Sequence, residues 1–276
     1  MNTAAEAQKE KVRNAYGEIA RTRNLQDSTE CCDTTCCSPA AGEITELSPD
    51  YSAEEISSVP PGAFLGEGSG NPVRAAQLQP GETVVDLGSG AGMDSFLAAN
   101  LVGETGRVHG FDMTPEMLER AKKNQAKGSY PQVEFQRTEI DALPLPGSSA
   151  DVVISNCVIN LAPDKLAVYQ EIFRVLKPGG RFAIADIALR GNAELVYQNA
   201  DKLPGCSCMT TALEENLYRK TIRQAGFEGV EIVAERAAIP QKDIESFARV
   251  LGLDPSDAKV SAHAVTLVGR KPAAAE

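Results

Sequence analysis

The stretch "TVVDLGSGAGMD", residues 83–94, decides the fold. Its apolar, β-branched beginning predicts a buried strand, and its three glycines predict a tight turn into a helix. The same alternation continues along the chain. Further strands are expected at 107–113, 133–140, 150–159, 181–189, 229–237 and 262–271, and helices at 93–102, 115–127, 164–176 and 212–226, with a turn at 177–180. This order predicts an α/β fold with a doubly wound, mostly parallel seven-stranded sheet and a ligand site at the carboxyl ends of its strands.

The region before this alternation has a different composition. Residues 4–24 have helical spacing of apolar side chains, whereas residues 25–72 are rich in Gly, Pro, Ser and Thr and predict an irregular arm with one short helix at 53–57. We therefore expect an N-terminal helix and cysteine-rich arm over 1–70 and a catalytic domain over 71–276. Residues 190–212 follow the fifth strand and are expected to form a substrate-binding insertion.

Composition excludes several classes of protein. The 276 residues are 42% hydrophobic and 24% charged, as in ordinary globular proteins. A net charge of −11 disfavours a nucleic-acid partner, because affinity for nucleic acids rests on basic groups. No apolar stretch is long enough to cross a bilayer, and the N-terminus lacks the apolar core of a signal peptide. We therefore expect a cytoplasmic monomer that has no membrane partner and whose thiols are mostly reduced.

Acidic residues follow three successive strands. The loop has the spacing G-x-G-x-G, and Met93 stands where the dinucleotide fingerprint has its third glycine. Asp86 precedes the loop, where a carboxylate suits a ligand's ammonium group and repels phosphates. Asp112 is placed to accept ribose hydroxyls, and Glu139 with Ile140 to contact an adenine. Each acid alone is as readily a helix cap or a solvated loop residue, but together they favour a nucleoside pocket.

Four short motifs carry a resemblance. "VVDLGSGAG", "GFDMTPEML", "DALPLP" and "RVLKPGGRF" resemble motifs of the class I S-adenosylmethionine-dependent methyltransferases, which have a Rossmann-like sheet. The resemblance covers about residues 71–276. It implies that the backbone at Gly88, Ser89 and Gly90 passes the methionine moiety, that Asp112 holds the ribose, and that Met113 packs on the adenine. Core packing is an equal alternative for Met113.

Seven cysteines suggest the methyl acceptor. Four lie in "CCDTTCC" (Cys31, Cys32, Cys36 and Cys37), Cys157 follows the fourth strand, and Cys206 and Cys208 lie in the insertion. Thiolates select soft metals and metalloids. Trivalent arsenic bound by thiolates keeps a lone pair that can attack a sulfonium methyl, so no strong general base is needed. A buried hydrophobe is the alternative for a single cysteine.

The stretches "NPVRAAQLQPGETVVDLGSGAGMDSFLAA" and "SNCVINLAPDK" resemble the arsenite methyltransferase family. The resemblance implies an enzyme that uses S-adenosylmethionine and a thiol reductant such as glutathione or thioredoxin. It implies arsenic delivery as a thiol conjugate, arsenic ligands at Cys157 and Cys206, and Asn156 beside the transferable methyl group. Many relatives carry a Gly-Cys-Gly element where this chain has Ser69. Two thiols could still bind methylarsenite, whereas binding inorganic arsenite with three sulfurs would need another thiol from the arm, from Cys208 or from glutathione.

Alternatives remain open at this stage. The arm cysteines suit arsenic capture, a tail without a catalytic role, or a zinc or iron–sulfur site, although vicinal pairs are less typical of zinc. The whole chain fits a methyltransferase of a small organic acceptor or a non-catalytic metalloid-binding protein less well. Tyr16 either covers the cofactor or packs at the surface.

Overall fold

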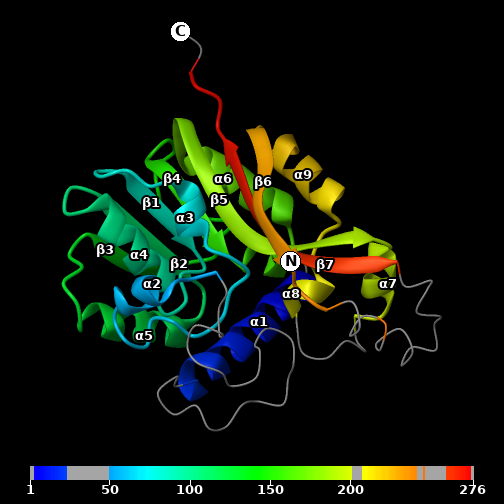
Figure 1. The fold of residues 1–276 in the computed structure, drawn as a ribbon, viewed down its shortest axis with the longest axis horizontal. Helices are drawn as coiled ribbons and strands as arrows, with labels where there is room; N and C mark the ends of the chain where they lie inside the picture. Colours follow the sequence, from blue (N-terminus) through cyan, green and yellow to red (C-terminus); the bar gives the residue numbers. More distant parts are fainter. Residues whose placement is uncertain (1–2, 24–49, 201–206, 241–244, 246–258, 275–276) are drawn as a thin grey trace.

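A computed structural model describes residues 3–23, 50–200, 207–240, 245 and 259–274 (Figure 1). Its centre is a seven-stranded sheet in the order β3-β2-β1-β4-β5-β7-β6. The strands are β1 Thr83–Leu87, β2 Arg107–Asp112, β3 Val133–Arg137, β4 Ala150–Asn156, β5 Leu176–Gly191, β6 Glu228–Ala237 and β7 Val260–Arg270. The first five are parallel, and β7 runs antiparallel to both β5 and β6. The predicted mostly parallel, doubly wound sheet is confirmed.

Helices cover both faces of this sheet (Figure 1). The longer ones are α1 Thr3–Thr22, α4 Met93–Val102, α5 Pro115–Gln125, α6 Lys165–Val175 and α9 Glu215–Gln224. Short helices are α2 Ala53–Ser57, α3 Pro72–Ala76, η2 Ile159–Leu161, α7 Ala193–Gln198 and α8 Ser207–Thr210. On one face, α6 and α9 pack Tyr169, Ile172 and Tyr218 against the sheet. On the other, α4 packs Phe96 against Val84 and Phe135 of the strands.

The lysine-proline-glycine-glycine segment differs from the predicted turn at 177–180, because it lies within β5. Leu176 pairs with Ala150, whereas Arg181 pairs with Val152, so the intervening residues bulge out of the ladder. The C-terminal segment holds this bulge, since the backbone N–H of Lys271 donates to Gly180 O at 2.8 Å. Long-range pairing has therefore overridden a local turn signal.

The fourth strand is shorter than predicted. It ends at Asn156, and the backbone of Cys157 turns left-handed with φ +58°, which leads into η2. Cys157 therefore lies just beyond the strand. The predicted helix at 53–57 is present as α2, whereas α3, α7, α8 and η2 were not anticipated.

Within the N-terminal region, residues 50–70 pack closely on the sheet. Tyr51, Val59 and Phe64 are buried in the same apolar cluster as α4 and β1. These residues thus form part of the main core, although apart from α2 they are irregular. The boundary proposed at residue 70 stays a prediction. Cys31, Cys32, Cys36, Cys37 and Cys206 lie outside the described residues.

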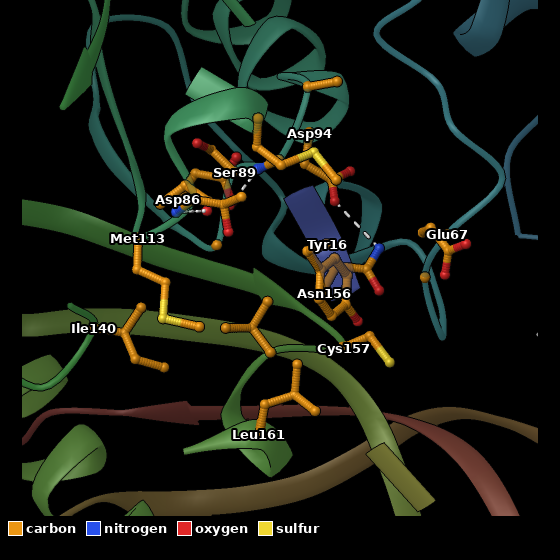
Figure 2. Close-up of a pocket in the computed structure, with 18 of the residues that line it drawn as sticks. Tyr16, Glu67, Asp86, Ser89, Asp94, Met113, Ile140, Asn156, Cys157 and Leu161 are labelled. Atoms are coloured by element: carbon orange, nitrogen blue, oxygen red, sulfur yellow. Dashed lines mark hydrogen bonds between the residues drawn. The ribbon is translucent and has the colours of Figure 1, made fainter. Parts of the chain in front are cut away.

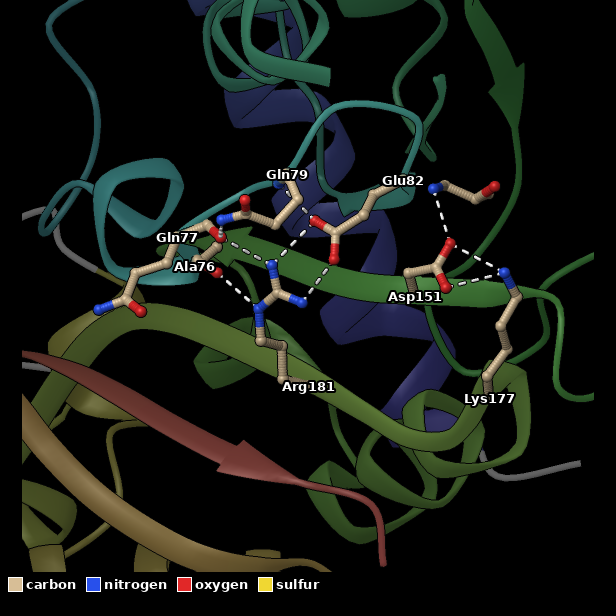
Figure 3. Close-up of polar contacts among 8 residues, drawn as sticks. Ala76, Gln77, Gln79, Glu82, Asp151, Lys177 and Arg181 are labelled. Atoms are coloured by element: carbon tan, nitrogen blue, oxygen red, sulfur yellow. Dashed lines mark hydrogen bonds and ion pairs between the residues drawn. The ribbon is translucent and has the colours of Figure 1, made fainter. Parts of the chain in front are cut away.

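The amino-terminal ends of the central strands are tied together by ion pairs (Figure 3). The guanidinium of Arg181 pairs with Glu82 at 2.7 Å and donates to the carbonyl oxygens of Ala76 and Gln77 at 2.6 and 2.9 Å. Nearby, Lys177 Nζ lies 2.8 Å from the carboxylate of Asp151. These contacts fix the segment after α3 to the sheet edge that lies opposite the pocket described below.

Candidate active site

One pocket lies at the carboxyl ends of β1, β2 and β4, below α1 (Figure 2). All the residues predicted to bind the cofactor line it, together with Cys157. They are Asp86, Gly88, Ser89, Gly90, Asp112, Met113, Glu139, Ile140 and Asn156. In Figure 2, Met113 and Ile140 lie toward one end of the cavity and Cys157 and Glu67 toward the other. The fold therefore brings the predicted nucleoside residues and one thiol into a single space, whereas the role of each residue stays a prediction.

The glycine loop lies tightly on the neighbouring structure. Gly88 has φ +71°, and a Cβ there would lie 2.2 Å from Cγ2 of Val158. Gly90 has φ +52°, and a Cβ there would meet nothing closer than 4.0 Å. The Oγ of Ser89, on the same loop, is buried and has no hydrogen-bond partner within the described protein. The loop thus leaves room at Gly90 and an unsatisfied hydroxyl at Ser89, as expected beside a polar ligand.

Two carboxyl groups are buried side by side in the pocket. Asp86 is 2% exposed and accepts a hydrogen bond from the Ser95 hydroxyl at 2.6 Å. Asp94 is 8% exposed and accepts one from the Tyr51 hydroxyl at 2.5 Å. Burial raises the pKa of both carboxyls, and the charge of Asp94 raises that of Asp86 further. Because their donors are neutral, a cationic group in the pocket would stabilise both ionised forms.

Asp112 is placed by backbone groups. One carboxylate oxygen accepts from Gly90 N at 3.0 Å, and the other accepts from Thr114 N at 2.7 Å. Burial raises its pKa, and these backbone hydrogen bonds oppose the shift. Thr114 is the N-cap residue of α5, but its side chain makes no capping bond. The Asp112 carboxylate thereby connects the glycine loop to the start of α5.

The pocket is closed by α1, a contribution that the sequence suggested only through Tyr16. Lys9, Val12 and Tyr16 of this helix line the cavity. The ammonium of Lys9 contacts the carboxylates of Glu139 and Asp141. Nothing in the local sequence around Lys9 marks it, because both partners are about 130 residues away.

The described thiols lie on two adjoining elements. Cys157 is 9% exposed and lines the pocket, and its backbone N–H donates to Ala185 O at 2.8 Å. A left-handed conformation costs a non-glycine residue about 1–2 kcal/mol, so the surrounding structure must hold it. Cys208 of α8 is 4% exposed and belongs to the same apolar cluster as Cys157 and Leu161. Cys208 therefore packs in the apolar cluster that contains Cys157, whereas Cys206 lies outside the described residues.

Sequence reasoning missed several pocket residues, among them Lys9, Tyr51, Glu67 and Asp94. Asp94 could have been found, because it lies at the start of the helix that follows the glycine loop. Tyr51 and Glu67 come from the irregular segment, whose course cannot be inferred from periodicity. Within the described residues, no cluster of three or more His, Cys, Asp or Glu could hold a metal ion, and no helix is long and apolar enough to span a membrane.

Glycine loop, strand-end acids and sheet order together define a methyltransferase of class I. A methyltransferase-domain family model matches residues 78–229. The crystal structure of an arsenic(III) S-adenosylmethionine methyltransferase from Chlamydomonas reinhardtii superposes with a TM-score of 0.63 at 33% identity, over 81% of this chain and 71% of that one. The chain belongs to the arsenite methyltransferase family.

Two curated relatives belong to the same family. An arsenite methyltransferase of Halobacterium salinarum is 43% identical over 82% of this chain, and one of Aquipseudomonas alcaligenes is 33% identical over 82%. The chain spans 59% and 64% of the length of these two proteins.

Proposed function

We propose that this chain transfers a methyl group from S-adenosylmethionine to trivalent arsenic bound on cysteine thiolates. The observation that carries the proposal is the position of Cys157, whose thiol lines the same pocket as Asp86, Asp112 and the glycine loop. A single cavity thus holds the predicted cofactor residues and a soft ligand for the acceptor.

The pocket residues fit this cofactor. Asp86 and Asp94 form a buried acidic end that suits an ammonium group, and the unpartnered Ser89 hydroxyl offers a further polar contact. Asp112 would accept the ribose hydroxyls, and Met113 and Ile140 would flank the adenine. When bound, the cofactor supplies an electrophilic methyl group on its sulfonium.

The acceptor site begins at Cys157. A second sulfur would come from Cys206, as the family resemblance implies, or from Cys208, which lies in the same apolar cluster as Cys157. The lone pair of arsenic attacks the methyl carbon, so that an As–C bond forms while the S–C bond breaks. No proton has to be removed, and the protein acts by holding the arsenic in line and keeping water out.

Several features of the cellular reaction follow as further proposals. Arsenic would arrive as a thiol conjugate, and glutathione or thioredoxin would keep arsenic trivalent and the cysteines reduced. Such reducing conditions are those of the cytoplasm, where we place the protein. Arsenic detoxification is the corresponding biological role.

The test is product formation by the purified full-length chain. It is incubated with the cofactor, a thiol reductant and either arsenite or methylarsenite, and the arsenic species are separated and quantified. Cys157→Ser should lower the rate about 10²-fold or more, since a hydroxyl is a poor ligand for a soft acceptor. Cys206→Ser and Cys208→Ser, compared separately, identify the second thiol.

A chain with all four arm cysteines replaced by serine provides a further comparison. Its activity tells whether the arm supplies the third sulfur. Absence of methylated arsenic from the wild-type reaction, or full activity in Cys157→Ser, would falsify the proposed function. Full activity in Cys157→Ser on an organic acceptor would point instead to a small-molecule methyltransferase.

A further inference from the structure

The side chain of Asn156 lies where three parts of the pocket meet. It is the last residue of β4 and directly precedes Cys157. Its side-chain amide nitrogen donates to Gly70 O at 2.9 Å, to the Tyr51 hydroxyl at 2.9 Å and to Asp94 at 3.2 Å. Its amide oxygen accepts from Ser69 N at 2.8 Å. One carboxamide therefore joins the 68–70 segment, the start of α4 and the end of β4 (Figure 2).

The direction of each hydrogen bond is determined by the partners. A backbone N–H can only donate and a carbonyl can only accept, so the oxygen of Asn156 must face Ser69 and its nitrogen must face Gly70. The Tyr51 hydroxyl donates its hydrogen to Asp94, which leaves its oxygen to accept from Asn156. A carboxamide has a donor and an acceptor at these two positions, which an ionised carboxylate lacks.

The 68–70 segment fits closely against its surroundings. A Cβ on Gly68 would lie 3.0 Å from the amide nitrogen of Asn156. A Cβ on Gly70 would lie 2.8 Å from Oγ1 of Thr266 and 2.9 Å from Cβ of Ala185. The segment therefore has one position relative to β4 and β5, and Asn156 provides the polar contacts that hold it there.

The side chain of Asn156 also affects the position of the Cys157 thiol. Cys157 has a strained left-handed backbone, and its N–H is held by Ala185. Asn156, the residue before it, is held by its side-chain hydrogen bonds to Ser69 and Gly70, so the chain is anchored where it enters the strained position. Since Asn156 has two N–H hydrogens and three protein acceptors, it has no donor to spare for a ligand.

We propose that Asn156 is a positioning residue, which sets the place of the 68–70 segment and of the Cys157 thiol relative to the methyl donor. This rests on the proposed function for the role of Cys157. Asn156 does not bind the cofactor directly.

The decisive variant is Asn156→Asp, which keeps the shape but places an oxygen against Gly70 O and Asp94. Two acceptors then face each other, so the segment should detach. Hydrogen–deuterium exchange of peptides covering residues 66–71 should become about 10-fold faster, with β1 unchanged. The kcat for arsenic methylation should fall about 10²-fold, whereas the Kd for S-adenosylhomocysteine should change by less than about 3-fold.

Two further variants keep the test sound. Asn156→Ala removes the contacts without adding charge and should show the same pattern if the charged variant does not fold. Asn100→Asp is the matched control, because Asn100 also donates to a carbonyl, that of Ser58, but at an exposed position. It should leave all three measurements unchanged.

The outcomes separate the two proposals. Unchanged exchange in residues 66–71, or a loss of S-adenosylhomocysteine affinity equal to the loss of kcat, overturns the positioning role. A wild-type chain that methylates no arsenic overturns the proposed function instead, and hydrogen exchange then still decides whether Asn156 holds the segment.

Discussion

Acidic residues at the two ends of the central strands have different hydrogen-bond donors. At the amino ends, Glu82 and Asp151 each face a basic side chain, Arg181 and Lys177 (Figure 3). At the carboxyl ends, Asp86 and Asp94 are more deeply buried, yet their hydrogen-bond donors are the neutral groups of Ser95, Tyr51 and Asn156. Among the described residues, no ion pair forms at either of these two acids.

Burying a carboxylate without a cation is costly, so a fold that only had to be stable would avoid it. At the amino ends, the acids Glu82 and Asp151 do form ion pairs with basic side chains of the chain. The missing positive charge at the carboxyl ends therefore indicates a ligand that brings its own. Changing an acid at the amino ends should therefore lower stability and leave ligand binding unchanged. Changing one at the carboxyl ends should weaken ligand binding without lowering stability.

The largest effect is expected at Asp86. Asp86→Asn keeps the shape but removes the carboxyl group that ionises when an ammonium binds, so S-adenosylhomocysteine, which carries the same ammonium, should bind about 10²-fold more weakly, or by about 2.7 kcal/mol. The ligand-free protein should be unchanged or more stable by about 1 kcal/mol. Isothermal titration and urea unfolding measure the two quantities.

Asp151→Asn is the matched control from the other strand ends. It breaks the pair with Lys177 and weakens the bond accepted from Thr83 N, so it should lower stability and leave binding unchanged. Equal loss of stability in both variants would contradict the contrast between the two ends.

The second prediction concerns the ion pairs at the amino ends. Arg181→Met breaks the ion pair with Glu82 and removes the guanidinium hydrogen bonds to the carbonyls of Ala76 and Gln77, so Glu82 and Gln77 keep only their bonds from Gln79. The free energy of unfolding should fall by about 2 kcal/mol, as measured by urea titration, with ligand affinity unchanged. Arg107→Met, at an exposed position of β2, should be neutral. A lost affinity in Arg181→Met would mean that the two ends are coupled.

The third prediction is a pH dependence. In the ligand-free protein the pKa of Asp86 is raised from its ordinary value of 3.8 by burial and by the charge of Asp94. The folded state then holds a proton that the unfolded chain has already lost. The contribution of Asp86 to stability should therefore be greatest below the ordinary value and fall as pH rises toward the raised one, by up to about 1.4 kcal/mol per pH unit for one proton.

Ligand affinity should change with the opposite sign, because an ammonium group favours the ionised carboxylate. It should rise over the same range in which the stability of the ligand-free protein falls. The free energy of unfolding and the affinity for S-adenosylhomocysteine are measured from pH 4 to pH 8.5. Asp86→Asn should make both quantities depend less on pH. A stability that rises with pH in the wild type but not in that variant would contradict the assignment.

The sequence predicted this site better at some residues than at others, for a physical reason. Asp86 and Asp112 follow strands with clear apolar periodicity, so their meeting at one sheet edge follows from parallel pairing. Asn156 and Tyr51 are 105 residues apart, and their contact depends on the irregular course of residues 50–70. The bulge at 177–180 likewise depends on Lys271, which a local turn signal cannot reveal. Contacts made by irregular segments carry no periodicity, which is why those of Tyr51 and Glu67 were missed.

The smallest effect is expected at Lys9, where a cation does reach the carboxyl ends, but only at the rim. Burial lowers its pKa, but hydrogen bonding to Glu139 and the charge of Asp141 outweigh this, so the pKa is raised overall. Its ammonium fastens α1 to the segment after β3 without touching Asp86 or Asp94. Lys9→Met should therefore speed the release of S-adenosylhomocysteine about 3-fold, measured by stopped flow, because partly exposed ion pairs contribute less than about 1 kcal/mol.

Salt should reproduce the effect of this variant, because 1 M salt screens the pair and should bring wild-type release close to that of Lys9→Met. Lys123→Met breaks an exposed pair with Glu119 on α5 and is the matched control, with release unchanged. A 100-fold loss of affinity in Lys9→Met would mean that the pocket cation comes from α1 and not from the ligand, which would remove the basis for the contrast between the two strand ends.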